Sequence, residues 1–572
     1  MRKRLPPAAD LSGLLSDANQ LLEGRQARDA LTFFDRILEL EPHDRESGIR
    51  AYAHFGAAQA SLSLGDREAG REHFRAAFRW PVSYLEAGLR LGEMLLADGE
   101  AHEACVLLEE VVGSEPGIAE AHYQLAAAYL QRDERELARA CAERALAISP
   151  TYPAAVTLLW LMRNASAGGR QRNQPRRHDT SVIWLVISPF LREWLGGQIY
   201  VLNLIRSLGL LPAPQRPRVI VSVLIDDYQE RPAVKDLIEQ IARESIVVNV
   251  LDAENRALLG HETQAIAETC STPSDGPDVV FPILYPCWPA SALHDVLFWI
   301  PDFQHRYLSE NFSLAEWRSR ENDLTALASR DVSVILSSND ALGALKQSFP
   351  HYRCRPHVWH FHSPPDIPNG HPGAPSGYAD LQSEGAVRRD YFCCPNQIRP
   401  GKGYETLFHA VALLRQAGDP VCVVCTGGDL RGQSQYHLDL EQLVANLHLE
   451  ESLVMTGVLP RSEQLDVMRR SRAIVQPSHF EGWSTVIEDA RMIGKPVIAT
   501  NLNVHYEQEH PRIRYFQVGD PVALAAELKK GLAELPAGWD SEAERCAVEE
   551  ARRLATRSAR EFVDIVSAAQ GR

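Results

Sequence analysis

The chain has 572 residues, of which 45% are apolar and 23% charged, the proportions of an ordinary globular protein. Its length exceeds what one hydrophobic core supports and predicts about three or four domains. The formal net charge of −16 argues against a protein that tracks nucleic-acid phosphates, since that function needs a basic face. The N-terminal basic residues precede no apolar run, and the longest apolar stretches reach about half the ~20 residues of a membrane span. We expect a cytoplasmic protein, at most peripheral at the inner face of the membrane.

Residues 1–165 are rich in alanine and leucine and repeat themselves at helical spacing. Pro116 and Pro150 lie 34 residues apart, and each closes a predicted helix pair. When the two copies are aligned on these prolines, Gly92 meets Ala126, so small residues recur where two helices would cross closely. The period resembles that of the tetratricopeptide repeat. The sequence therefore predicts an all-α solenoid of four repeats with a capping helix, suited to binding an acceptor or a partner protein.

Residues 166–180 are rich in Gly, Arg and Gln and have no apolar face, which predicts a flexible linker or, alternatively, a basic docking segment. Beyond them, short β-branched runs alternate with helix-length segments in two series, divided by a Pro- and Gly-rich stretch at 363–376. This alternation predicts two Rossmann-like doubly wound α/β domains, at 181–370 and 371–572. A final helix at 543–569 could cross back between them. A ligand would lie between the domains, at the carboxyl ends of the strands.

The most informative stretch of the sequence is 476–500. A strand ends at its start, a loop containing Glu481 follows, and a helix begins near Thr485. Unpaired backbone amides at such a helix start can hold a diphosphate. Glu481 and Asp489 would present two carboxylates to one pocket, where they could accept hydrogen bonds from vicinal hydroxyls. Glu488 could simply cap the helix.

This stretch resembles the donor-site motif of family 4 glycosyltransferases, which are retaining enzymes with the GT-B fold. The family motif has Glu, seven residues and a second Glu; these positions hold Glu481 and Asp489 here. The resemblance implies that Glu481 contacts the hydroxyls of the donor sugar and that Asp489 contacts the ribose, with Glu488 as a substitute for it. It places further donor-binding residues at Gly482, Trp483, Ser484 and Thr485.

A second resemblance lies at 395–403, which is similar to the loop that brings a cation to the donor diphosphate. The resemblance gives this role to Lys402. Gln397 stands where the family has arginine, and Arg399 follows two residues later. The resemblance also places Gly196 and Gly197 in a loop near the donor phosphates. It places Gly457 and the adjoining Val458 beside the nucleotide.

A third resemblance covers 299–308, which is similar to a segment of relatives of mannosyl- and rhamnosyltransferases. It makes Asp302 and His305 candidates for orienting the acceptor hydroxyl or assisting proton transfer. A buried, satisfied pair is the alternative. His357, His360 and His362 alternate with aromatic residues and are interpreted as packing residues. No Asp-x-Asp occurs, so neither a metal nor a cofactor is expected beyond the nucleotide-sugar substrate.

The resemblance implies a GT-B fold in which 181–370 binds the acceptor and 371–572 binds the donor. The implied enzyme is a retaining, metal-independent hexosyltransferase that moves a hexose or deoxyhexose, mannosyl- or rhamnosyl-like, from a nucleoside-diphosphate sugar. Its acceptor would be a glycan, a lipid-linked sugar or a polypeptide, with polysaccharide biosynthesis as one setting. Two alternatives stay open: a non-catalytic tetratricopeptide scaffold with a degenerate sugar-nucleotide domain, suggested by Gln397 and Asp489, and a protein O-glycosyltransferase linked to such repeats.

Overall fold

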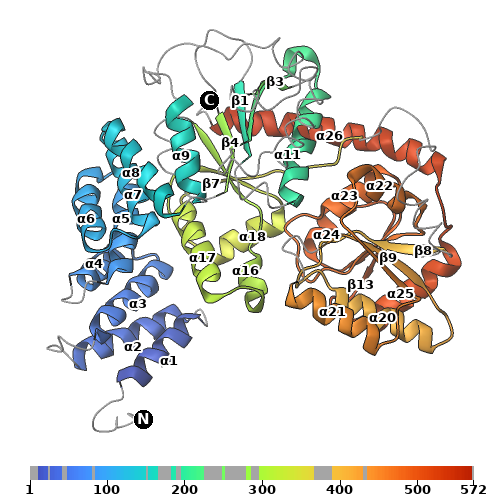
Figure 1. Ribbon diagram of the computed structural model, residues 1–572, viewed down its shortest axis with the longest axis horizontal. Helices are drawn as coiled ribbons and strands as arrows, with labels where there is room; N and C mark the ends of the chain where they lie inside the picture. Colours follow the sequence, from blue (N-terminus) through green and yellow to red (C-terminus); the bar gives the residue numbers. More distant parts are fainter. Residues whose placement is uncertain are drawn as a thin grey trace.

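The structure of the chain is a computed structural model with a helical solenoid followed by two parallel sheets, each surrounded by helices (Figure 1). It describes residues 11–23, 26–40, 48–79, 84–149, 152–164, 182–187, 195–223, 248–251, 279–284, 295–365, 390–428 and 434–569. The predicted linker at 166–180 and the predicted boundary at 370 lie outside these residues. Within them, no helix combines the length and the apolar character that crossing a bilayer requires.

The solenoid consists of antiparallel helix pairs, as the repeat period predicts. Its helices are α1 (Leu11–Glu23), α2 (Ala27–Leu40), α3 (Ile49–Ser63), α4 (Arg67–Phe78), α5 (Leu85–Asp98), α6 (Ala101–Ser114), α7 (Ala119–Gln131), α8 (Arg135–Ile148) and α9 (Pro153–Asn164). Small residues allow the close crossings, because a Cβ on Gly92 would lie 2.8 Å from Leu108 Cδ2. The predicted repeat solenoid is confirmed.

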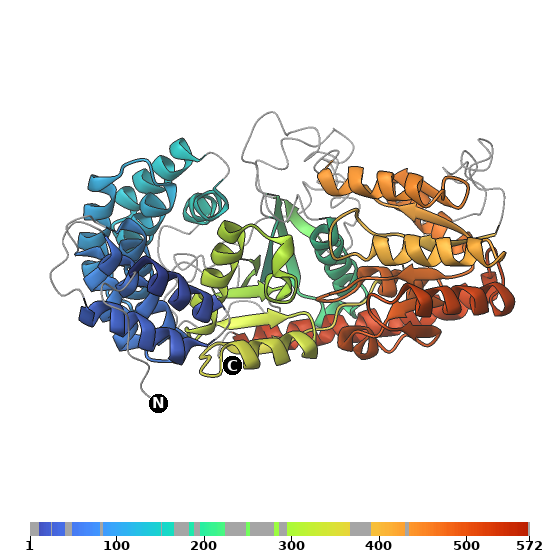
Figure 2. The ribbon, with the colours of Figure 1, turned by 90° about the horizontal axis from the view of Figure 1, so that it is seen from below.

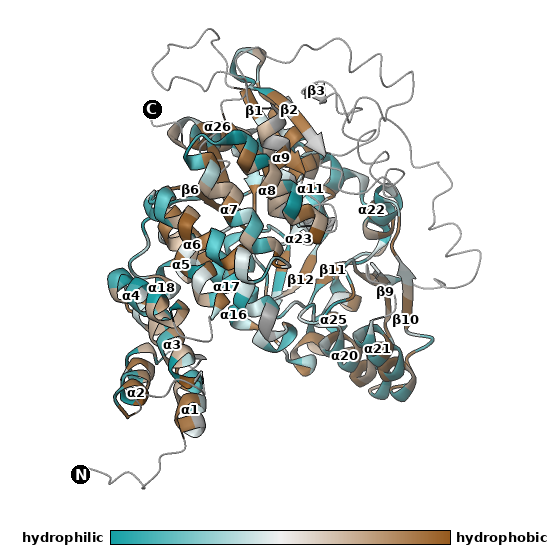
Figure 3. Cartoon of the chain, turned by 60° about the vertical axis from the view of Figure 1, so that its left-hand side comes forward, coloured by the Kyte–Doolittle hydropathy of each residue, from teal (hydrophilic) through white to brown (hydrophobic). Residues whose placement is uncertain are grey.

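The first sheet contains seven parallel strands in the order β3-β2-β1-β4-β5-β6-β7. Its elements are β1 (Val182–Ile187), α11 (Leu195–Gly209), β2 (Arg218–Val223), β3 (Val248–Leu251), β4 (Val279–Ile283), β5 (Val296–Ile300), α16 (Gln304–Tyr307), α17 (Leu314–Ala328), β6 (Ser333–Leu336), α18 (Asn339–Ser348) and β7 (Arg355–Val358). Strands β1 and β2 are hydrophobic, whereas the helices carry hydrophilic residues on their outer sides (Figure 3). The sheet is therefore buried between helices, as expected for parallel strands.

The second sheet contains six parallel strands in the order β10-β9-β8-β11-β12-β13. Its elements are β8 (Tyr391–Cys394), α20 (Tyr404–Gln416), β9 (Cys422–Thr426), α21 (Gln435–Asn446), β10 (Leu453–Gly457), α22 (Arg461–Arg470), β11 (Ile474–Gln476), α23 (Thr485–Met492), β12 (Val497–Thr500), α24 (Asn503–Glu507), β13 (Ile513–Phe516), α25 (Pro521–Glu534) and α26 (Ser541–Ala569). The strand order reverses between β8 and β11, and in the first sheet between β1 and β4. Ligands of doubly wound sheets bind beside such reversals. The two predicted Rossmann-like domains of a GT-B fold are confirmed.

The last helix, α26, packs against both sheets. Its residues Phe562, Ile565 and Val566 join the core of the first sheet, whereas Ala551 joins a core of the second. Trp359, just after β7, donates its indole N–H to the carbonyl of Ser558 in α26 at 2.9 Å. Figure 2 shows α26 running beneath both sheets. The helix therefore joins the two domains that flank the predicted ligand site.

A cluster of charged residues joins the solenoid to the first sheet's helix α17. Arg330, which follows α17, donates to the backbone carbonyl of Glu93 in α5 at 3.2 Å, and Arg90 pairs with Glu93 and with Glu120. Asp323 of α17 belongs to this cluster. Burial raises the pKa of Asp323 to about 8, and the charges of Glu93 and Glu120 act in the same direction, against Arg90. Asp323 is therefore protonated in the folded protein at neutral pH.

The raised pKa of Asp323 predicts that this residue makes stability fall as pH rises. The unfolded carboxyl has a pKa of about 3.9, so the folded state binds the extra proton between that value and about 8. The contribution of Asp323 to the free energy of unfolding is complete below pH ~4 and is lost as pH rises through about 8. Asp323→Asn should flatten the fall in melting temperature between pH 6 and pH 8, whereas the exposed Asp331→Asn should leave it unchanged. Equal slopes in Asp323→Asn and the parent protein would contradict the assignment.

Candidate functional site

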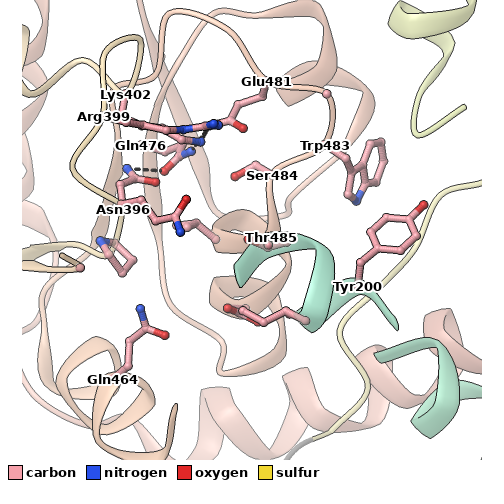
Figure 4. Close-up of a pocket in the computed structure, with 18 of the residues that line it drawn as sticks. Tyr200, Asn396, Arg399, Lys402, Gln464, Gln476, Glu481, Trp483, Ser484 and Thr485 are labelled. Carbon is pink, nitrogen blue, oxygen red and sulfur yellow. Dashed lines mark hydrogen bonds and ion pairs between the residues drawn. The ribbon is translucent and has the colours of Figure 1, made fainter. Parts of the chain in front are cut away.

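A pocket lies between the two domains, at the carboxyl ends of the strands on either side of both order reversals. Its empty space, about 1150 Å³, includes a part that is open to solvent. The first domain contributes residues from α11 and from the loops after β5 and β6, and the second contributes the loops after β8, β9, β10 and β11. Figure 4 shows Lys402 and Glu481 on one side of the pocket and Gln464 well away from them.

Lys402 and Glu481 form an ion pair in the loops that follow β8 and β11. The Lys402 Nζ lies 2.5 Å from Glu481 Oε1, and Gln476 Nε2 donates to the same oxygen at 2.9 Å. Burial alone would raise the pKa of Glu481, but the Lys402 ammonium and its hydrogen bond bring that pKa below its usual value. Burial lowers the pKa of Lys402, although Glu481 opposes the shift. The pocket therefore holds an ionised carboxylate beside a desolvated cation.

Two more nitrogen donors of the same loop line the pocket. Arg399 Nε and Gln397 Nε2 are buried and have no hydrogen-bond partner among the residues that the structure describes. A buried unpaired donor costs free energy, on the order of 1–3 kcal/mol, unless a ligand satisfies it. Together with Lys402 these donors are suited to an anionic ligand. The sequence predicted all three at this position.

Asp489 also lines the pocket, but it is paired within the protein. Arg461, the first residue of α22, approaches it with both terminal nitrogens, at 2.5 Å to Oδ1 and 2.7 Å to Oδ2. Ser363 Oγ donates to Oδ1 at 2.9 Å. The carboxylate that the resemblance assigns to the ribose is thus held by an arginine.

Glu488, one residue earlier on α23, points away from the pocket into the protein. Its fully buried carboxylate accepts from His362 Nδ1 at 2.7 Å and from Gln508 Nε2 at 2.9 Å, and lies 3.4 Å from Arg491 Nε. Burial would raise its pKa, but His362 and Arg491 lower it to about 2. The structure therefore places Glu488 in a contact between the interdomain segment and the second domain, away from the ligand side of the helix.

The remaining loop residues of the motif surround the start of α23. Trp483, Ser484 and Thr485 line the pocket, and the Ser484 hydroxyl caps the helix by accepting from the Ile487 amide. Gln508 holds this turn, because its side chain accepts from the Ser484 amide and donates to the Ser484 carbonyl. The helix start is thereby fixed with its first residues facing the pocket.

On the first-domain side, Asp302 lines the pocket and His305 does not. Asp302 Oδ1 accepts from the backbone amide of Gln304 at 2.9 Å, so the chain turns into α16 directly after it. That turn carries His305 toward α17, where its buried ring lies 3.2 Å from the Glu321 carboxylate and packs near Trp317. Of the two candidates, only Asp302 faces the site; His305 occupies the buried, hydrogen-bonded position that was the alternative.

Of the other residues predicted to border the nucleotide, some line the pocket and some do not. Gly196, at the start of α11, and Val458 line the pocket, whereas Gly197 and Gly457 do not. Gly457 has a φ of 72° and accepts from the Gly427 amide at 2.8 Å, so it shapes the turn after β10.

The three interdomain histidines have separate surroundings. His360 lies 2.6 Å from Glu507 and stacks on Trp483, and His362 lies beside Glu488. His357 lies on β7, and burial lowers its pKa. Across the described parts of the chain, no three His, Cys, Asp or Glu side chains gather as metal ligands would.

Gly482 of the second domain packs directly against the loop that follows β5 in the first. A Cβ on Gly482 would lie 2.3 Å from the Pro301 carbonyl oxygen and 2.9 Å from Asp302 Cβ. Gly482→Ala should therefore push the domains apart and lower the rate of a reaction in this pocket by about 100-fold, the effect of a displacement near 1 Å. The matched control is Gly343→Ala, an open position in α18 where alanine favours the helix. Steady-state rates that are equal for the two variants would contradict this role.

The structure adds pocket residues to which the sequence analysis assigned no role: Arg461, Gln464, Gln476, Asn396 and Tyr200. Asn396 and Gln476 are polar residues at the carboxyl ends of β8 and β11, and Asn396 Nδ2 donates to Gln476 Oε1 at 2.9 Å. Their position after buried strands was the signal that could have identified them. Arg461 and Gln464 begin α22 and carry no such signal. Tyr200, on α11, stacks on Trp299 at 4.2 Å.

Comparisons with known proteins found two matching family models and a number of similar solved structures. Residues 381–544 match the family described as glycosyl transferases group 1, and residues 119–152 match the tetratricopeptide repeat. A glycosyltransferase from Rickettsia africae is 15% identical over 68% of this chain and 99% of its own, with a TM-score of 0.46. An O-GlcNAc transferase mutant from Thermobaculum terrenum is 15% identical over 92% and 100%, with a TM-score of 0.41. An Anabaena protein in complex with UDP and glucose is 17% identical over 68% and 98%, with a TM-score of 0.40. No curated protein matches the chain.

Proposed function

We propose that this chain, which carries a group 1 glycosyltransferase domain behind tetratricopeptide repeats, is a retaining glycosyltransferase. It moves a hexose or deoxyhexose from a nucleoside-diphosphate sugar to a glycan, a lipid-linked sugar or a polypeptide. The donor lies in the second domain and the acceptor enters from the first. The reaction uses the residues of the pocket and needs no cofactor.

One observation carries this proposal: three nitrogen-bearing side chains from one loop converge beside a buried carboxylate. Lys402 pairs with Glu481, and the buried nitrogens of Arg399 and Gln397 have no partner among the described residues. These donors face the same pocket as the start of α23, where Thr485 lies. Cations and helix-start amides at one point are suited to a diphosphate.

The chemistry follows from the leaving group. The bond between the sugar's anomeric carbon and the diphosphate oxygen breaks, and negative charge builds up on that oxygen. The acceptor oxygen bonds to the same carbon, and the departing diphosphate takes the acceptor's proton. Lys402 and Arg399 stabilise this charge in a site that excludes much of the water. Glu481 accepts from the donor sugar's hydroxyls, and Gln476 holds its carboxylate in place. Asp302 faces the pocket from the other domain and orients the acceptor hydroxyl.

The solenoid would supply the acceptor or a partner protein. It lies beside the first domain, which is the acceptor side of the pocket (Figure 1). The contact between Arg330 and Glu93 holds α5 of the solenoid to this domain. An acceptor bound along the repeats would thus be kept near the pocket, and its effective concentration there would rise.

A ligand panel tests the proposal. Purified full-length protein is heated with UDP, GDP, dTDP, ADP and their sugars, and a selective donor at 100 times its Kd should stabilise the fold by about 2.7 kcal/mol. Donor turnover is then measured with the stabilising sugar. Binding without hydrolysis or transfer would favour the non-catalytic scaffold. If no nucleotide or nucleotide sugar of the panel binds, the proposal that the pocket is a donor site is contradicted.

A further inference from the structure

The pocket contains an ion pair whose geometry bears on which nucleoside it accepts. Arg461 grips Asp489 with two parallel hydrogen bonds, one to each carboxylate oxygen, at 2.5 Å and 2.7 Å. Asp489 is only 3% exposed. In such a bidentate pair the arginine takes up both carboxylate oxygens on one side. That is the side on which a carboxylate could otherwise accept hydrogen bonds from two adjacent hydroxyls.

The pair is held from both ends. Ser363 donates to Asp489 Oδ1 at 2.9 Å, and Asn203 of α11 donates in turn to the Ser363 hydroxyl at 3.1 Å. On the other end, Arg461 Nη1 also approaches Gln464 Oε1 at 3.3 Å. The ion pair therefore belongs to a chain of contacts that runs from the first domain to α22, and it is part of the closed arrangement of the two domains.

The pair lies at the end of the pocket away from the reacting centre. Gln464, a neighbour of Arg461, lies well apart from Lys402 and Glu481 in Figure 4. A donor whose diphosphate meets Lys402 and whose sugar meets Glu481 would extend its nucleoside toward Arg461 and Asp489. The pentose of that nucleoside would meet a paired carboxylate.

A paired carboxylate recognises a vicinal diol poorly. To accept from the 2′- and 3′-hydroxyls together, Asp489 would have to give up its two bonds with Arg461, whose partly buried guanidinium would lose its carboxylate partner. A pentose without the 2′-hydroxyl has no vicinal diol, so its binding does not require Asp489 to give up its bonds with Arg461. The arginine thus removes the interaction that would otherwise select a ribonucleotide.

We propose that Arg461 is a specificity-determining residue, which makes the donor site accept 2′-deoxyribonucleoside diphosphates as readily as ribonucleoside diphosphates. This inference rests on the proposed donor-binding function. The substrate class it adds is a deoxynucleoside-diphosphate sugar, such as a thymidine-linked one.

Matched ligand pairs that differ only in the 2′-hydroxyl test the inference: UDP with dUDP, GDP with dGDP, and ADP with dADP. Binding to the full-length protein is measured by titration calorimetry, and the pair that binds is used. The expected ratio of the two Kd values is within about threefold, whereas a hydroxyl held by a charged acceptor changes it roughly 10- to 100-fold. A larger preference for the ribonucleotide overturns the inference. If no pair binds, the proposed function fails first and the inference falls with it.

Arg461→Gln adds a gain-of-selectivity test. The variant frees Asp489 from the fork, so the ribonucleotide should bind about tenfold or more tightly than its deoxy partner. Arg470→Gln, on the same helix and paired with Asp466 outside the pocket, is the matched control and should keep the parent's ratio. A folded Arg461→Gln protein with an unchanged ratio contradicts the role of Arg461. If that variant does not fold, the ratio of the parent protein alone decides.

Discussion

Replacement of Lys402 by alanine is expected to lower kcat for sugar transfer by about 100- to 1000-fold, the usual effect of removing one preorganised group that meets charge in the transition state. The ammonium has three donors, and its contact with Glu481 uses one of them. The other two can face the departing diphosphate. Burial lowers the pKa of Lys402, and the same exclusion of water strengthens its attraction for the developing charge.

Steady-state kinetics with the donor found in the ligand panel measures this effect. Lys529→Ala, which removes an exposed lysine of α25, is the matched control and should leave kcat unchanged. Glu481→Ala should also lose transfer, because it removes both the sugar contact and the acceptor that positions Lys402. Activity of either site variant within about threefold of the parent protein would disprove the assignment.

The largest expected effect on stability comes from Glu488→Ala, at about 3–5 kcal/mol, the cost of removing one partner from a buried charge contact. The change leaves the His362 ring, the Arg491 guanidinium and the Gln508 amide without their common acceptor. Since the pKa of Glu488 is lowered to about 2, its contribution is present above the unfolded value near 4.3 and is lost as pH falls toward 2.

Thermal unfolding at pH 7 measures this loss. Glu549→Ala, on the exposed side of α26, serves as the control and should shift stability by no more than about 0.5 kcal/mol. Glu488→Gln keeps the shape of the side chain and removes its charge, so an intermediate loss is expected. A melting temperature for Glu488→Ala equal to that of the control would show that the buried contacts of Glu488 add nothing to stability.

The strand pattern could be predicted because most strands are buried on both faces. Val279–Ile283 and Cys422–Thr426 are fully buried and read as continuous apolar or β-branched runs. The strand β5 (Val296–Ile300) was not predicted, although it is a mostly buried central strand. The strand β13 (Ile513–Phe516) was not predicted either. It is the edge strand of its sheet, and Arg514 and Tyr515 keep part of their surface exposed, so it lacks the apolar run of a central strand.

The sequence predicted the site residues that lie in loops directly after strands. It did not predict the contacts that depend on how distant helices pack. Lys402 and Glu481 belong to short loops directly after strands, and the sheet order brings these loops together. Arg461 and Asp489 lie 28 residues apart on different helices, so their pairing depends on how α22 packs beside α23. The direction of His305 depends on the turn that Asp302 starts. No pattern in the sequence specifies either packing.

The position of helix α26 also sets an order of assembly during synthesis. The sheet of β1 to β7 buries one face against Phe562 and Val566, so its core stays incomplete while the second sheet is being translated. At usual ribosome speeds that interval is on the order of 10–40 s. The solenoid contacts mainly its own sequence neighbours and can fold as soon as it emerges. The first sheet therefore completes its core only after the last helix of the chain has been made.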